Sequence, residues 1–245
     1  DIKDNALYKN RLMMLDIVAN NNWKRPIYFT GGSFGDDDYL WMKDYLQLDG
    51  MVYKLVPVKN AVADAPSPLD MGQIDSDKMF DIVMKWDWGN SESSSIYHDT
   101  ETRKNSITYR TNLARLMETL INEGKNEKAL KVIDLAMEKM PLEYFGYYTM
   151  IEPFAAGYYE LGQKEKARKI LTQLIGKYQD KLKHYNTYKA DDQLSMYVEI
   201  VTAIERYRDL LKVMKDRGDK AFFESNKTTF NTYNKMFPRF KRENE

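Results

Sequence analysis

The stretch from Arg110 to Pro141, RTNLARLMETLINEGKNEKALKVIDLAMEKMP, decides the fold expected for this 245-residue chain. Its apolar residues recur at intervals of three and four, the spacing that places them on one face of an α-helix. Gly124 interrupts this period halfway, and Pro141 ends it. The stretch therefore predicts two helices joined by a short turn.

The same stretch aligns with a tetratricopeptide repeat, which is a helical hairpin of about 34 residues. Its turn, EGKNEKA, is close to the consensus, and Pro141 stands at the last consensus position. Ala129 and Ala136 fall at the two small positions where the paired helices cross closely. The packing positions of the first helix are Leu113, Leu116, Met117 and Leu120.

A second, more degenerate copy follows at 148–179, YTMIEPFAAGYYELGQKEKARKILTQLIGKYQ. The central alanines, Ala129 and Ala167, are 167 − 129 = 38 positions apart. Leu174 replaces the second alanine, and Gln179 replaces the proline. The other packing positions hold Ile151, Phe154, Ala155 and Tyr158.

A third hairpin is expected at 194–237, because one hairpin cannot bury its apolar face without a neighbour. The apolar seam of its first helix comprises Leu194, Tyr197, Val201, Ile204 and Leu211.

The first 60 residues alternate between helix and strand patterns. A helical period at 5–21 ends in three asparagines, and the β-forming run PIYFT follows from Pro26. Residues 36–48 predict a second helix, and MVYKLVPV at 51–58 predicts a second strand. Two strands joined by a helix favour a parallel pair.

The expected fold is therefore mostly α, with a small α/β N-terminal portion followed by tetratricopeptide-like helical hairpins. Three ranges follow from these patterns: the α/β portion at 1–60, a linker at 61–102 and the helical array at 103–245. The linker contains a short helix near 77–86 and the polar stretch NSESSSIYHDTET at 90–102, whose composition is typical of a mobile loop.

Composition excludes several classes of function. Lysine plus arginine equals aspartate plus glutamate, at 37 each, so no global basic field favours nucleic acid. The chain lacks cysteine, which excludes disulfides and thiol nucleophiles. No stretch approaches the ~20 apolar residues of a membrane span, and no motif calls for a cofactor.

The glycine-rich run TGGSFGDDD (30–38) invites a nucleotide-site interpretation. It lacks the first glycine of a dinucleotide fingerprint and the lysine of a P-loop. Asp36 and Asp38 match the D-x-D of metal-dependent sugar-nucleotide enzymes. The favoured interpretation is a turn whose aspartates cap the following helix.

Aromatic residues flank the polar loop. Trp86, Trp88 and Tyr97 are candidates for stacking on a sugar or a peptide, although the tryptophans equally suit pinning a helix end to the core. His98 and His184 lack a nucleophile motif and are interpreted as surface histidines.

The inner face of each first helix lines a groove in tetratricopeptide arrays. This face is polar and slightly acidic, which suits a peptide or another domain of the same protein. By register, its candidate partner-binding residues are Thr111, Glu118, Asn122, Thr149, Glu152 and Tyr159.

Two N-terminal blocks and the helices after them resemble a known family. NNNWKRPIYFTGG (20–32) and YLQLDGMVYKLVPV (45–58), followed by helices at 110–179, resemble the C-terminal soluble region of polytopic membrane proteins common in Bacteroidetes. These proteins, formerly of unknown function, are similar to protein O-mannosyltransferases. The shared motif, RPIYF…YLxLxGxxYxLVP, contains no catalytic residue.

The resemblance implies a non-catalytic domain on the periplasmic face of the inner membrane. Such a domain would hold an acceptor protein, a glycan or the membrane part of the same chain. Two alternatives remain: a free-standing peptide-binding tetratricopeptide module, and a metal-dependent enzyme that uses Asp36 and Asp38.

Overall fold

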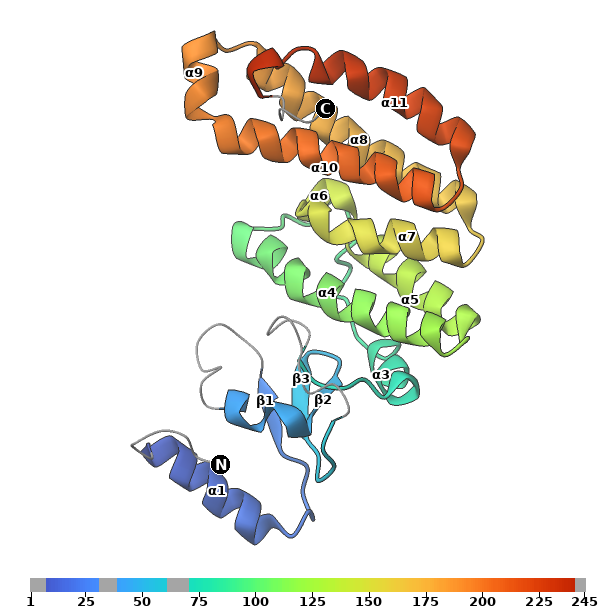
Figure 1. The fold of residues 1–245 in the computed structure, drawn as a ribbon. Coiled ribbons are helices and arrows are strands. Elements are labelled where there is room, and N and C mark those ends of the chain that lie inside the picture. Colours follow the sequence, from blue (N-terminus) through green and yellow to red (C-terminus); the bar gives the residue numbers. More distant parts are fainter. Residues whose placement is uncertain (1–7, 31–38, 61–70, 241–245) are drawn as a thin grey trace. The chain divides into compact units, whose positions relative to one another are not determined.

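The computed structural model describes residues 8–30, 39–60 and 71–240 of the chain, and its main elements are shown in Figure 1. The chain divides into two compact units, Asp1–Met140 and Pro141–Glu245. Helices dominate both units, and a small three-stranded sheet lies near the N-terminus. The expected fold class is confirmed. The ranges 1–60, 61–102 and 103–245 were drawn from sequence patterns and stay a prediction.

Helix α1 (Lys9–Asn21) opens the described part of the first unit. The residue that follows it, Asn22, has a left-handed backbone with φ 48°, a conformation that asparagine tolerates better than most residues. The asparagine stop was predicted correctly. The helix has no buried residue, so its apolar positions do not form part of a core here.

Strands β1 (Tyr28–Thr30), β2 (Leu46–Asp49) and β3 (Val52–Leu55) form one sheet in the order β1-β3-β2. Both strand pairs are antiparallel. The expected parallel pair is therefore wrong.

The reason lies in a hairpin that the helical interpretation of 36–48 concealed. The chain forms only a 3-10 helix, η1 (Leu40–Tyr45), and then turns extended. Leu46 and Leu48 are fully buried and pair with β3 across the two-residue loop Gly50-Met51. Glycine with a positive φ at the first loop position is typical of a tight hairpin, and hairpin strands are antiparallel by construction.

Three helices complete the first unit: α3 (Ser76–Val83), α4 (Thr100–Asn122) and α5 (Asn126–Lys139). Helices α4 and α5 pack as the hairpin predicted from 110–141. The packing residues predicted for this hairpin are all at most 2% exposed: Leu113, Leu116, Met117, Leu120, Ala129 and Ala136. That the hairpin is a tetratricopeptide repeat stays an interpretation.

Polar side chains of α4 bind the backbone of the sheet and of the segment that follows it. The Asn112 side chain donates to the carbonyl oxygen of Gly50 at 2.8 Å. The Arg115 guanidinium donates to the carbonyl oxygens of Met71 at 2.9 Å and Gly72 at 2.8 Å. These bonds satisfy backbone acceptors that belong to no ladder, which joins α4 to the α/β portion.

The polar stretch at 90–102 has defined contacts with the end of α5. The Ser91 hydroxyl donates to the carbonyl oxygen of Lys139 at 2.6 Å, and the ammonium of Lys139 lies 2.7 Å from Glu92. His98 is buried, with Nε2 2.9 Å from the carbonyl oxygen of Ser91. The surface interpretation of His98 is therefore wrong, whereas His184 is exposed as expected.

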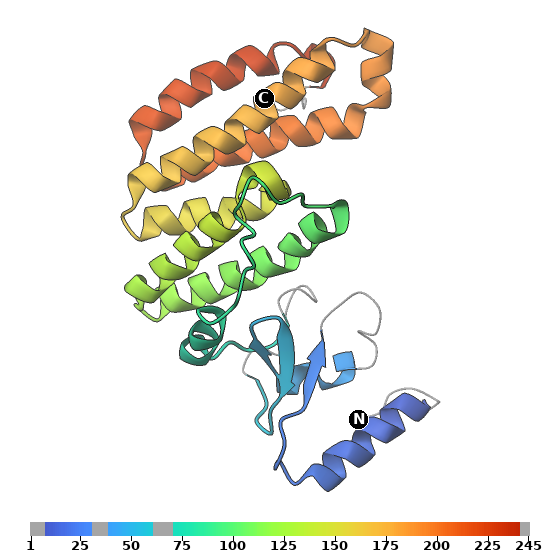
Figure 2. The same cartoon turned by 180° about the vertical axis from the view of Figure 1, so that it is seen from behind.

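The second unit is helical, and Figure 2 shows its helices from behind. Helices α7 and α8 form a hairpin, α10 packs against α8, and α11 packs against both α8 and α10. The elements are α6 (Leu142–Phe145), η3 (Tyr148–Ile151), α7 (Glu152–Glu160), α8 (Lys164–Asn186), α9 (Ala190–Ser195), α10 (Tyr197–Asp216), α11 (Lys220–Asn234) and η4 (Pro238–Phe240).

The core of this unit confirms most of the predicted packing. Phe154 and Leu174 are fully buried, and Ile204 and Leu211 are nearly so. The first two positions of the third seam are wrong, because Leu194 is 51% and Tyr197 52% exposed. Leu194 belongs to the short helix α9, and Tyr197 begins α10, so the buried face of α10 starts only at Ile200.

Candidate functional site

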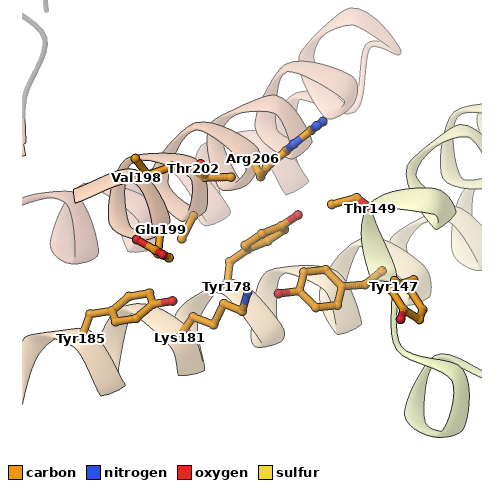
Figure 3. A pocket seen from close by; sticks show the side chains of 11 residues that line it. Tyr147, Thr149, Tyr178, Lys181, Tyr185, Val198, Glu199, Thr202 and Arg206 are labelled. Carbon is orange, nitrogen blue, oxygen red and sulfur yellow. The ribbon is translucent and has the colours of Figure 1, made fainter. Parts of the chain in front are cut away.

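A half-open pocket lies in the second unit between α8 and α10, with the segment around η3 at one end (Figure 3). Its volume is about 380 Å³. Tyrosine is the commonest residue in the lining, which comprises Tyr147, Tyr148, Thr149, Tyr178, Lys181, Tyr185, Val198, Glu199, Thr202, Ala203 and Arg206.

An unusual turn brings two of these tyrosines to the pocket. Gly146 has φ 64° and ψ −139°, a combination that only glycine adopts readily. Tyr147 follows with φ 44° and ψ 48°, a left-handed backbone that is uncommon for a large side chain. Tyr148 then begins η3, and its ring lies edge-on to Tyr178 with centroids 5.3 Å apart. Backbone strain of this kind gathers at functional positions.

Helix α8 supplies one wall. Tyr178, Lys181 and Tyr185 stand at intervals of three and four, so they share one face of the helix. Figure 3 shows Lys181 and Tyr185 projecting from α8 toward α10, which carries Glu199 and Thr202. Tyr178 is only 2% exposed and forms the inner part of the wall.

A half-buried carboxylate, that of Glu152, supports this inner wall. The Tyr178 hydroxyl donates to Oε1 of Glu152 at 3.4 Å, and Nη1 of Arg206 lies 3.6 Å from Oε2. Burial raises the pKa of Glu152, and Arg206 opposes part of that rise. Burial also raises the pKa of Tyr178, so its hydroxyl stays protonated and remains a donor.

The outer part of the pocket carries charges with few protein partners. The ammonium of Lys181 sits 5.2 Å from the centroid of the Tyr148 ring, a cation–π distance. Within the described part of the chain, neither Lys181 nor Glu199 has an ion pair. The Tyr148 hydroxyl is buried and has no hydrogen-bond partner there. The exposed side chains of Lys181 and Glu199 are therefore available to a ligand, whereas the Tyr148 hydroxyl is enclosed by the protein.

The predicted groove residues of the second repeat divide between two places. Thr149 lines the pocket, and Glu152 supports it from below. Tyr159 lies elsewhere, because its hydroxyl donates to Oδ2 of Asp219 at 2.9 Å. Asp219 is 1% exposed and also accepts hydrogen bonds from Arg168.

The other three predicted groove residues lie on α4, in the first unit. Thr111 is half-buried, whereas Glu118 and Asn122 are exposed.

The three aromatic residues predicted to stack on a ligand, Trp86, Trp88 and Tyr97, also differ in their surroundings. Trp86 and Trp88 pack on each other, with ring centroids 5.6 Å apart, and both pack on Tyr109. Their faces are therefore engaged in a cluster that fixes the end of α3. Tyr97 stands apart at 87% exposure.

A metal site has no support in the described residues. Among them, no group of three or more histidine, aspartate or glutamate side chains is placed to hold an ion. Asp36 and Asp38 lie outside the described residues, so their candidate D-x-D stays a prediction.

Sequence reasoning missed most of the pocket. The repeat register predicts binding residues on the inner face of each first helix, and therefore does not predict Tyr147, Tyr148, Lys181 or Tyr185. One local signal was present: the spacing of Tyr178, Lys181 and Tyr185 marks an amphipathic second face on α8. The opposite wall on α10 has no comparable signature.

No helix in the described ranges combines the length and apolarity needed to cross a membrane. Searches among curated proteins and among solved structures each return no match. The profile of a family described as TMEM260-associated domain 2 matches residues 1–78. This match relates the N-terminal part of the chain to a domain associated with a membrane protein.

Proposed function

We propose that the chain is a non-catalytic, extracytoplasmic recognition domain of a membrane glycosyltransferase-like protein. In this proposal it lies on the periplasmic face of the inner membrane and holds a partner in the tyrosine-lined pocket. The partner is an acceptor protein or glycan, or the membrane part of the same protein.

The pocket is the observation that carries this proposal. Its volume of about 380 Å³ lies within the range of small-ligand and peptide-anchor sites, roughly 300–1,000 Å³. Tyrosine offers a large apolar face and one polar atom, which makes it common at recognition surfaces. The family match at residues 1–78 supports the membrane context.

The chemistry of the lining favours binding over catalysis. The ionisable groups nearest the buried wall, Glu152 and Arg206, are directed at each other and at Tyr178. The pocket lining contains no serine–histidine pair, which is one common arrangement for nucleophilic catalysis. The groups that do face the opening, Lys181 and Glu199, lie on opposite helices without pairing.

The proposal is tested by replacing Val198 with a photo-crosslinking amino acid in the protein expressed in its native cells. Val198 lines the pocket and is 69% exposed, so a larger side chain can be accommodated there. A discrete covalent adduct is expected, and Thr202→Trp, which fills the pocket, is expected to abolish it. The matched control carries the label at Asp191, an exposed residue outside the pocket. The same adducts from Asp191, or no adduct from Val198, would overturn the proposal.

A further inference from the structure

We infer that the pocket between α8 and α10 takes a proline-rich segment in the polyproline II conformation. This inference rests on the proposed function and names the chemical class of the partner. It follows from three properties of the lining: aromatic faces, an excess of hydrogen-bond donors and unpaired charges at the opening.

Aromatic rings enter the pocket from two directions. Tyr147 and Tyr148 come from the turn before α7, and Tyr178 and Tyr185 come from α8. Tyr147 is 37% exposed, and Tyr185 is partly exposed, so part of each ring is open to a ligand. Grooves lined by aromatic rings are the recurrent receptors of proline-rich segments.

The hydrogen-bonding capacity of the lining is biased toward donors. Lys181 and Arg206 are donors only, whereas the tyrosine and threonine hydroxyls of the lining both donate and accept. A polyproline II segment matches this bias, because its carbonyl oxygens have no internal partners and its prolines have no N–H. A sugar would also require acceptors for its hydroxyl hydrogens, and apart from hydroxyl groups the lining side chains offer one acceptor, the carboxylate of Glu199.

The charges at the opening indicate what would flank the prolines. Glu199 lies toward the end of the pocket opposite Tyr147 and Thr149 (Figure 3), and no cation of the described chain pairs with it. A basic residue beside the prolines would pair with this carboxylate. The rigid polyproline II backbone loses little entropy on binding, which favours capture by a small pocket.

Titration of the ¹⁵N-labelled chain with synthetic decaproline, followed by NMR, tests the inference. Saturable shifts at pocket residues are expected, and adding an arginine to one end of the peptide is expected to strengthen binding. A glycine–serine peptide of equal length is the control ligand. A neutral mannose hexasaccharide distinguishes the competing chemistry.

Three variants locate the effect. Tyr185→Ala removes a partly exposed aromatic face of the lining and is expected to weaken binding about two- to tenfold, the range for one aromatic contact. Lys181→Met is expected to weaken binding similarly, whereas Lys177→Met, on the same helix but outside the lining, is expected to leave it unchanged. Each variant is first checked for an unchanged circular dichroism spectrum and melting midpoint.

The outcomes separate this inference from the function on which it rests. Binding of the hexasaccharide in place of decaproline would overturn the inference, as would decaproline binding that Tyr185→Ala and Lys181→Met leave unchanged. If decaproline fails while the Val198 adduct still forms, the recognition function stands and its ligand is of another class. If both fail, both proposals fall.

Discussion

Arg168 holds Asp219 through two parallel hydrogen bonds, Nε to Oδ2 at 2.8 Å and Nη2 to Oδ1 at 2.8 Å. Arg168 lies on α8, and Asp219 stands at the start of α11. The hydroxyl of Tyr159, on α7, donates to the same carboxylate at 2.9 Å. The buried carboxylate of Asp219, at the start of α11, therefore links α11 to α7 and α8.

Removing that carboxylate is expected to destabilise the second unit. Asp219→Ala leaves the Arg168 guanidinium and the Tyr159 hydroxyl without their acceptor. Because Arg168 is 30% exposed and can regain water, the loss should lie toward the lower end of the range for buried pairs, about 2 to 3 kcal/mol. Urea unfolding monitored by circular dichroism measures it.

Asp216→Ala is the matched control, because Asp216 is an exposed aspartate at the end of α10. Its removal is expected to change the free energy of unfolding by less than about 0.5 kcal/mol. Equal effects of the two substitutions would contradict a structural role for Asp219.

The same ion pair predicts acid sensitivity. Hydrogen bonds from Arg168, with smaller help from Tyr159 and Lys164, hold the pKa of Asp219 well below its usual value. The folded state then binds fewer protons than the unfolded state, so this stabilisation is complete above the unfolded pKa of about 3.9. It is lost as the pH falls below that value. Unfolding free energies measured from pH 6 to pH 3 should decline less steeply in Asp219→Asn than in the wild type.

Glu152 predicts the opposite pH dependence. Burial raises its pKa in the folded state, so the folded chain binds more protons than the unfolded chain near the ordinary pKa of about 4.3. The wild type therefore loses this contribution as the pH rises through that region. Glu152→Gln does not titrate, so its stability relative to the wild type should increase from pH 4 to pH 7. A relative stability that falls with pH would contradict the assigned shift.

Arg110 is fully buried on α4, and its Nη2 donates to the carbonyl oxygen of Met140 at 2.9 Å. Burial lowers the pKa of this guanidinium to about 10, which measures how unfavourable its charge is there. Arg110→Ala removes the packing and the bond together and should cost about 3 kcal/mol. Arg110→Met keeps most of the volume and removes the buried charge, so its loss should be about 1 kcal/mol.

Tryptophan fluorescence measures the destabilisation of the first unit by the Arg110 substitutions. All four tryptophans, at positions 23, 41, 86 and 88, belong to the first unit, so their signal follows that unit while circular dichroism follows both. Lys104→Ala, an exposed change on the same helix, serves as the control. If Met proves as destabilising as Ala, the hydrogen bond outweighs the packing.

Local periodicity predicted the helical part of the fold well. The buried positions of the first hairpin, such as Leu113 and Ala129, were identified because a regular helix repeats its buried face every three to four residues. The hairpin of β2 and β3 was missed because Leu46 and Leu48 also fit the end of a helix. Only pairing with a neighbouring strand distinguishes the two, and a single sequence does not contain that pairing.

The residues predicted from the register of the second repeat overlap the pocket in part: Thr149 lines it and Glu152 lies behind it, whereas Lys181 and Tyr185 were not predicted. A binding role for Thr149 and Glu152 stays a prediction. The role of Lys181 and Tyr185 depends on α10 lying against α8, and on the left-handed turn at Tyr147. A contact between helices and a rare backbone conformation both arise from tertiary structure, so neither leaves a periodic signal.

Substitution of Gly50 tests the packing of the first unit, because a Cβ atom at this position would cause both backbone strain and a steric clash. It has φ 73° in the β2–β3 turn, and a Cβ built there would lie 2.9 Å from the Trp86 ring. Gly50→Ala should therefore cost about 2 to 4 kcal/mol from backbone strain and a clash with a packed ring. Gly89→Ala shares the positive φ, at 53°, but its Cβ would meet nothing within 4 Å, so only the strain of about 1 to 2 kcal/mol is expected. Urea unfolding followed by tryptophan fluorescence compares the two. Equal losses would mean that Trp86 moves aside without cost, and that the aromatic cluster with Trp88 and Tyr109 does not fix the hairpin.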